Sequence, residues 1–153
     1  MLQLHRVFCA TPWELEGERR RFTELIGEFN ETRALPHQVL FVPVSLINIG
    51  DKRPVQYVID ENIEACRHYL LVLTDSWGPE QRNFRKDYLL ALQCQADPKL
   101  PMAEVCVLHK RFPSEPALPE GFPTPDGEFS TMDQFVEQVT AFLERSLAAL
   151  TAK

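Results

Sequence analysis

The chain has 153 residues, 44% of them hydrophobic and 25% charged, which excludes a disordered, fibrous or coiled-coil protein. This length predicts one domain over residues 1–153. The net charge of −6 argues against a nucleic-acid partner, and no apolar run approaches the ~18 residues of a membrane helix. The N-terminus also lacks the basic and then apolar segments of a signal peptide, so we expect a cytoplasmic protein with no membrane partner.

The first predicted elements are a strand over residues 4–9 and an amphipathic helix. Thr11 is expected to cap this helix, with Pro12 at its first position and Glu14 completing a T-x-x-E capping box. The run of arginines at 19–21 falls mostly opposite the apolar stripe, which favours a solvated helix surface over a phosphate clamp. The stripe itself consists of Leu15, Phe22, Leu25, Ile26 and Phe29.

Three further strands are predicted over residues 39–44, 69–73 and 104–109. The nearly continuous apolar character of residues 39–44 is typical of a parallel strand that is covered on both faces. Two helices separate the three strands, one opening at Pro54 and one running from about 83 to 95. Their predicted buried sides are Val55, Val58, Ile59 and Ile63 in the first, and Phe84, Tyr88, Ala91 and Leu92 in the second.

Residues 110–129 form a proline-rich segment in which we expect a loop. A degenerate fifth strand and helix, held by Phe112, Phe122 and Phe129, is the alternative. The last helix is predicted to begin with an S-x-x-D capping box made by Ser130 and Asp133. Its apolar stripe is Phe135, Val139, Phe142, Leu143, Leu147 and Leu150.

Strands that alternate with helices predict an α/β fold, a parallel sheet with helices on both faces. Ligands bind such sheets beyond the carboxyl ends of the strands, which nominates the loops 10–14, 45–54 and 74–82. These loops carry aromatic, hydroxyl, acidic and cationic side chains, a mixture that suits a nucleotide or a sugar. The binding candidates among them are Thr11, Trp13, Arg53, Ser76 and Trp77.

Several chemistries are disfavoured by missing motifs. The sequence has no G-x-G-x-x-G, no P-loop and no G-x-S-x-G. The four cysteines show neither C-x-x-C nor zinc-site spacing, and the four histidines show no ligand spacing, so we expect no metal site and no bound cofactor. Buried free thiols are the favoured interpretation of Cys9, Cys66, Cys94 and Cys106.

Three segments taken in order resemble a TIR domain. Residues 53–74 read like its central loop, its "I-x-x-N-I" helix and its "I-V-V-L-S" strand. Residues 86–92, KDYLLAL, look like the segment "W-x-x-K-E-I…A-L" that follows. Residues 7–11, with Glu18 and Arg19 downstream, resemble the opening of stand-alone bacterial TIR-like proteins. The resemblance covers residues 4 to 110 and returns at the last helix.

This resemblance implies a flavodoxin-like three-layer sandwich of order 2-1-3-4-5, with a weak fifth strand. It also implies NAD as a substrate whose nicotinamide–ribose bond is cleaved by a glutamate on the third helix, in signalling or bacterial defence. Asp87 stands where that glutamate is expected, and Glu80 is the spare acid. Trp77 or Trp13 would stack on a ring, and Arg53 would meet the pyrophosphate.

Other interpretations stay open. Aspartate is one methylene shorter than glutamate, about 1.5 Å in reach, so the chain is alternatively a non-catalytic TIR-like module. Such a module would bind a nucleotide signal or a protein, or self-assemble through the loop 45–54. A solvated Asp87 paired with Lys86 or Arg85 is an equal alternative to a catalytic one. A nucleoside deoxyribosyltransferase-like enzyme ranks last, because its D-x-G-T-x-x-E pattern is not visible.

Overall fold

A computed structural model describes residues 1–45, 56–77, 84–111 and 121–152. Within these ranges five strands form one parallel sheet of order β2-β1-β3-β4-β5, the flavodoxin-like topology. This confirms the predicted fold class and strand order. The strands are β1 (Gln3–Ala10), β2 (Val39–Val44), β3 (His68–Leu73), β4 (Glu104–Lys110) and β5 (Gly127–Phe129).

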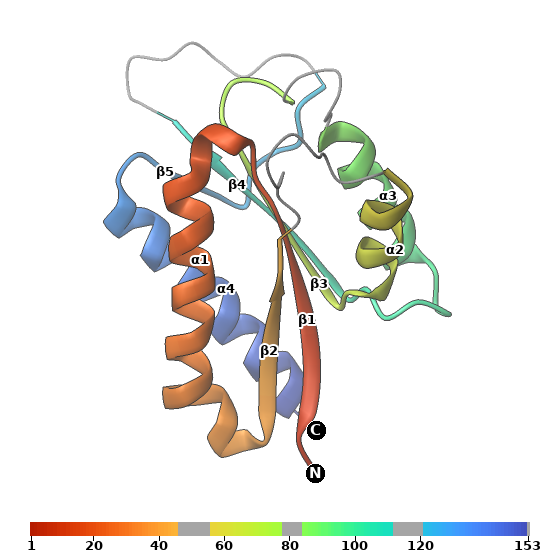
Figure 1. Cartoon of the computed structure of the whole chain (residues 1–153), viewed down its shortest axis with the longest axis vertical. Coiled ribbons are helices and arrows are strands. Elements are labelled where there is room, and N and C mark those ends of the chain that lie inside the picture. Colours follow the sequence, from red (N-terminus) through yellow and green to blue (C-terminus); the bar gives the residue numbers. More distant parts are fainter. Residues whose placement is uncertain (46–55, 78–83, 112–120, 153) are drawn as a thin grey trace.

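Two helices cover each face of the sheet (Figure 1). On one face α1 (Glu16–Phe29) packs beside α4 (Met132–Thr151). On the other face α2 (Gln56–Ala65) packs beside α3 (Phe84–Ala96). Successive strand residues point to opposite faces, so Val7 joins the α1/α4 core and Phe8 the α2/α3 core. None of the helices in the described residues is both long and apolar enough to cross a membrane.

The start of α1 differs from the prediction. The Thr11 capping box is wrong, because a 3-10 turn over Trp13–Leu15 comes first and α1 begins at Glu16. The Leu15 backbone N–H bonds to the Pro12 carbonyl, and neither segment has a side-chain cap. Thr11 precedes this turn, so its hydroxyl does not reach the orphan N–H groups of the helix.

The C-terminal part of the fold corrects one further prediction and confirms another. The capping box of α4 is made by Thr131 and Gln134, one residue later than the predicted Ser130 and Asp133. A short strand, β5, forms inside the proline-rich segment and confirms the predicted weak fifth strand. The strand register is fixed by Asp126, whose carboxylate accepts from the Val107 N–H and whose own N–H donates to the Val107 carbonyl, both at 2.8 Å.

The predicted buried sides of α2 and α3 are partly wrong. Ile59, Ile63, Phe84 and Ala91 are buried as expected, but Val58 is 41% exposed. Tyr88 and Leu92 are only half-buried, and Asp87 takes a buried position in their place. Both helices therefore present apolar surface outward.

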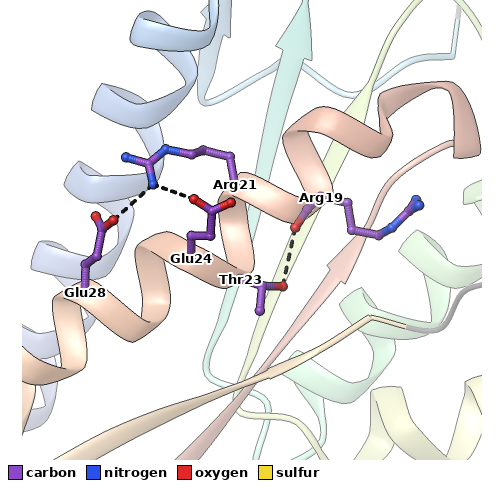
Figure 2. A network of polar contacts seen from close by, with 5 residues as sticks. All are labelled: Arg19, Arg21, Thr23, Glu24 and Glu28. Carbon is purple, nitrogen blue, oxygen red and sulfur yellow. Dashed lines mark hydrogen bonds and ion pairs between the residues drawn. The ribbon is translucent and has the colours of Figure 1, made fainter.

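The arginines of α1 form local ion pairs on the outer surface. Figure 2 shows Arg21 between Glu24 and Glu28, with N–O distances of 3.2 and 3.1 Å. Arg20 pairs with Glu16 at 2.8 Å, and its side chain is 75% exposed. These pairs one or two turns apart on one helix confirm the solvated-surface interpretation.

The outer edge of β2 is covered by one side chain. Beyond α1 the helix widens to a π turn at Asn30–Ala34. The Asn30 side-chain amide donates to the Phe41 carbonyl at 2.8 Å, and its oxygen accepts from the Phe41 N–H at 2.9 Å. Two residues on, Pro43 has no N–H to offer. The edge is therefore protected from pairing with another strand.

Candidate functional site

The candidate site lies at the carboxyl edge of the sheet, beside β1 and β3. β1 lies between β2 and β3 in the sheet. The helix that follows β1 covers one face of the sheet, and the helix that follows β2 covers the other face. In parallel sheets a ligand crevice opens at such a reversal of strand order. Ala10 is in register with Leu71, so the segments that follow β1 and β3 leave the sheet at the same edge.

Thr11 follows β1 directly and is 7% exposed. Its Oγ1 has no hydrogen-bond partner among the described residues. A buried hydroxyl left unpaired costs ~1–3 kcal/mol, so such a group in a native structure calls for an explanation. A ligand oxygen at the end of β1 would provide the missing partner.

Asp87 lies in the first turn of α3 and is 0% exposed. This burial contradicts the interpretation of Asp87 as a solvated acid. Gln56, the first described residue of α2, donates to Asp87 Oδ1 at 3.1 Å and to Asp60 Oδ1 at 2.7 Å. The position also favours a carboxylate because the N-terminus of a helix carries partial positive charge. The first turns of α2 and α3 therefore hold a buried acid between them.

Trp77 and Ser76 follow β3. The Trp77 ring packs against Phe122 at a centroid distance of 4.8 Å and against Tyr88 at 6.0 Å. Its carbonyl accepts from the Phe84 N–H at 2.9 Å, which ties it to the start of α3. Ser76 is exposed. Trp77 is thus half-buried by other rings of the chain, and part of it stays accessible.

His109 is a buried polar residue that we did not assign to the site from sequence. It is 3% exposed at the end of β4, and its Nε2 lies 2.6 Å from the Thr74 carbonyl. Because a carbonyl only accepts, this nitrogen carries the proton, while Nδ1 has no partner in the described part of the chain. The sequence offered one signal, the place of His109 at the edge of a predicted strand. This signal did not single out His109, because the other three histidines shared it.

Some predicted residues fall outside the described ranges. Glu80, Arg53 and most of the loop 45–54 belong to this group. The backbone of Trp13 is described within its 3-10 turn. Thr11, Ser76, Trp77 and Asp87 are thus the predicted site residues whose side chains the structure describes, and the Thr11 hydroxyl makes no hydrogen bond to Asp87.

A shallow groove of about 300 Å³ runs between the outer surfaces of α2 and α3. It begins at Gln56, the residue that also holds Asp87. Asp87 therefore lies beneath one end of a surface groove. The groove is lined by Gln56, Asp60, Lys86, Leu89, Leu90 and Gln93.

Thiolate chemistry does not fit this structure. All four cysteines are free and buried, as predicted. Burial raises the pKa of the Cys9, Cys66 and Cys106 thiols to about 12, so they stay protonated at neutral pH. Within the described residues, no three His, Cys, Asp or Glu side chains are grouped to hold a metal ion.

No protein-family profile and no curated protein sequence matches this chain. The parallel sheet and its strand order are what the structure establishes, and many unrelated activities share that architecture. The function of this chain therefore depends on particular side chains and not on the fold alone.

Proposed function

We propose that the chain is a TIR-like domain that binds NAD at the carboxyl edge of β1 and β3 and cleaves its nicotinamide–ribose bond, in nucleotide signalling or bacterial defence. The observation that carries this proposal is the burial of the Asp87 carboxylate. An acid that is 0% exposed at a helix N-terminus, next to the expected crevice, marks a candidate for function.

The proposed reaction requires one well-placed carboxylate. The C–N bond between ribose and nicotinamide breaks, and its electron pair leaves with the cationic ring, which departs as neutral nicotinamide. The remaining sugar is an oxocarbenium-like cation, which the Asp87 carboxylate stabilises. A water oxygen then bonds to the sugar carbon and releases a proton.

The other site residues would bind and orient the nucleotide. Thr11 offers its unpaired hydroxyl to a ribose or phosphate oxygen, and Trp77 offers the exposed part of its ring for stacking. Arg53 and Trp13 keep the pyrophosphate and stacking roles suggested by the sequence. Asp87 meets the sugar only if Gln56 moves aside, which would open the groove between α2 and α3 towards it.

The test is incubation of the purified protein with NAD while free nicotinamide is measured. Asp87→Asn should abolish nicotinamide release and leave the circular dichroism spectrum unchanged. Asp60→Asn is the matched control, because it alters the other carboxylate bonded to Gln56. A concentration series should accompany these assays in case activity needs assembly, and Glu80→Ala tests the spare acid.

A second variant sharpens the test. Asp87→Glu extends the carboxylate by about 1.5 Å, and a misplacement of about 1 Å costs on the order of 10²-fold in rate. We expect this variant to raise turnover by up to that factor. Equal turnover in the wild type, Asp87→Asn and Asp87→Glu proteins would contradict the proposal.

A non-catalytic binding module is the second candidate. The bond from Gln56 to Asp87 favours it, because that bond ties α2 to α3 as a purely structural link would. This module would bind NAD without releasing nicotinamide. A thermal shift with NAD that Thr11→Val removes, in the absence of any turnover, would support this second function.

A further inference from the structure

The amino-terminal half of β1 pairs with a strand on one side only. β2 pairs with β1 from Gln3 onwards, whereas β3 pairs with it only from Val7. The N–H and C=O of one strand residue point to the same side, and those of the next residue point to the opposite side. The Gln3 N–H donates to the Gln38 carbonyl beside β2 at 2.8 Å, so the backbone groups of Leu4 point away from β2. Among the described strands none pairs with Leu4 on that side, which leaves an open edge.

This open edge lacks the protection of the outer edge of β2, where Asn30 bonds to the Phe41 backbone. β1 and β2 extend past the ends of α2 and α3 (Figure 1), and Leu2 and Leu4 are 48% and 61% exposed. Natural proteins cover or charge an open strand edge, because its unpaired backbone groups attract another strand. An uncovered edge beside two exposed leucines therefore marks a surface that binds an extended peptide.

The open edge ends where β3 begins. The Arg67 N–H donates to the Arg6 carbonyl at 3.0 Å, and from Val7 onwards β3 occupies the position beside β1. The Arg6 N–H points to the same side and has no backbone partner in the described ranges. A segment that lies in line with β3 must therefore stop at Arg67, which suits the end of a chain better than its middle. We call this position the β1 slot, which is bounded by Leu2, Leu4, Arg6 and Arg67.

Positive charge gathers at the closed end of the β1 slot. Arg6 is exposed and Arg67 is half-buried, and neither forms an ion pair with a carboxylate in the described part of the chain. Burial lowers the pKa of His5, and the positive charge of Arg67 lowers it further, so Arg67 lies close to this residue of β1. The Arg67 Nε is also buried without a hydrogen-bond partner among the described residues. Two arginines without carboxylate partners, on a chain with a net charge of −6, favour an anionic ligand group.

We propose that the β1 slot binds the C-terminal segment of a partner protein as an added strand parallel to β1. The N–H of the terminal residue donates to the Leu4 carbonyl, and its carboxylate accepts from the Arg6 N–H and pairs with the Arg67 guanidinium. The penultimate side chain then lies beside Leu4, which favours an apolar residue there. The slot lies at the amino edge of the sheet, so this interaction is independent of NAD cleavage at the carboxyl edge.

The test measures binding of a fluorescent synthetic peptide to the full chain by anisotropy. The peptide alternates threonine and valine, with valine in the penultimate position and a free C-terminal carboxylate, because backbone bonds give strand addition its affinity. We expect saturable binding below about 1 mM. The C-terminal amide should bind at least about tenfold more weakly, since it leaves the Arg67 charge unpaired. N-methylation of the terminal residue should abolish binding, whereas N-methylation of the penultimate residue, whose N–H points away from β1, should not.

Variants of the chain separate the charge from the backbone pairing. Arg67→Gln should weaken binding of the acid peptide at least about tenfold and leave binding of the amide peptide unchanged. Arg20→Gln removes an exposed arginine from the outer surface of α1 and is the matched control, which should change neither. Leu4→Pro removes the N–H that faces the slot and no bond to β2, so it should abolish binding and leave the circular dichroism spectrum unchanged.

Failure of the acid peptide to bind up to about 1 mM would overturn the proposal, as would equal binding of the acid and amide peptides. Full binding to both Leu4→Pro and Arg67→Gln would overturn it as well. Sedimentation equilibrium of the chain alone tests another occupant, because a dimer that Leu4→Pro abolishes would show that a second copy fills the slot instead. The nicotinamide assay is unaffected by any of these results, so the two proposals fail separately.

Discussion

The two faces of the sheet are covered to different extents. On the α1/α4 face a 20-residue helix packs beside the 14 residues of α1, and Phe22, Phe135 and Phe142 are wholly buried. On the α2/α3 face the helices have 10 and 13 residues and leave Tyr57 and Leu89 exposed. The better-covered face supplies packing, whereas the other retains the surface and the buried acid that a binding site needs.

The largest expected effect tests packing on the α1/α4 face. Phe142 is 0% exposed, and its ring lies 6.2 Å from that of His68. Phe142→Ala should lower the free energy of unfolding by about 3–5 kcal/mol through lost burial and a cavity. Val58→Ala, on the other face, should change it by less than about 1 kcal/mol because Val58 is 41% exposed. Urea denaturation measures both, and equal losses would remove the difference between the faces.

Two asparagines on opposite faces provide the next comparison. Asn30→Ala should cost at least about 2 kcal/mol, since the buried N–H and C=O of Phe41 both lose their partner. It should also promote aggregation through the uncovered edge of β2, which light scattering would detect. Asn62→Ala removes only an exposed bond to the Val58 carbonyl and should cost less than about 0.5 kcal/mol. A tolerated Asn30→Ala would show that β2 needs no such cover.

A smaller effect separates the two threonines near helix starts. Thr131→Ala should destabilise the protein by about 1 kcal/mol, because its hydroxyl oxygen accepts from the Gln134 N–H at 3.2 Å. Thr11→Val should be neutral or slightly stabilising, because the Thr11 hydroxyl has no partner among the described residues. Thermal melting without nucleotide measures both. A loss of similar size at Thr11 would restore the capping role first expected of it.

The smallest expected effect appears only in acid. Burial by itself raises the pKa of Glu104. The contacts with His68 at 3.4 Å and Ser146 at 2.7 Å outweigh this effect, so the pKa lies below the usual glutamate value. The Glu104 carboxylate therefore binds a proton less readily in the folded state than in the unfolded chain. The contribution of Glu104 to stability is present above the usual pKa and is lost as the pH falls through the folded value.

Urea midpoints across the acid range check this dependence. Glu104→Gln should flatten that part of the stability profile. Glu144→Gln, which removes an exposed pair with Arg33 from α4, should not change its shape. An unchanged profile in Glu104→Gln would show that other carboxyl groups set the acid sensitivity of the α1/α4 face.

The sequence by itself determined the α/β class, the first four strands within a residue or two at each end, and the buried stripes of α1 and α4. These features depend on local periodicity, because a residue's position along a strand or helix fixes which face it takes. The resemblance to TIR domains supplied the strand order. The sequence also directed attention to the loops after β1 and β3, since parallel strands end at a common edge.

Only the tertiary structure decided the burial of Asp87, the role of Asn30 and the position of His109. Each depends on residues distant in the chain: Gln56 holds Asp87, Phe41 pairs with Asn30, and Thr74 contacts His109. The strand β5 is a further case, because Asp126 and Val107 fix its register from outside the strand. The local sequence pattern does not encode such contacts. A polar residue has the same neighbours in sequence whether water or a distant strand provides its hydrogen-bond partner.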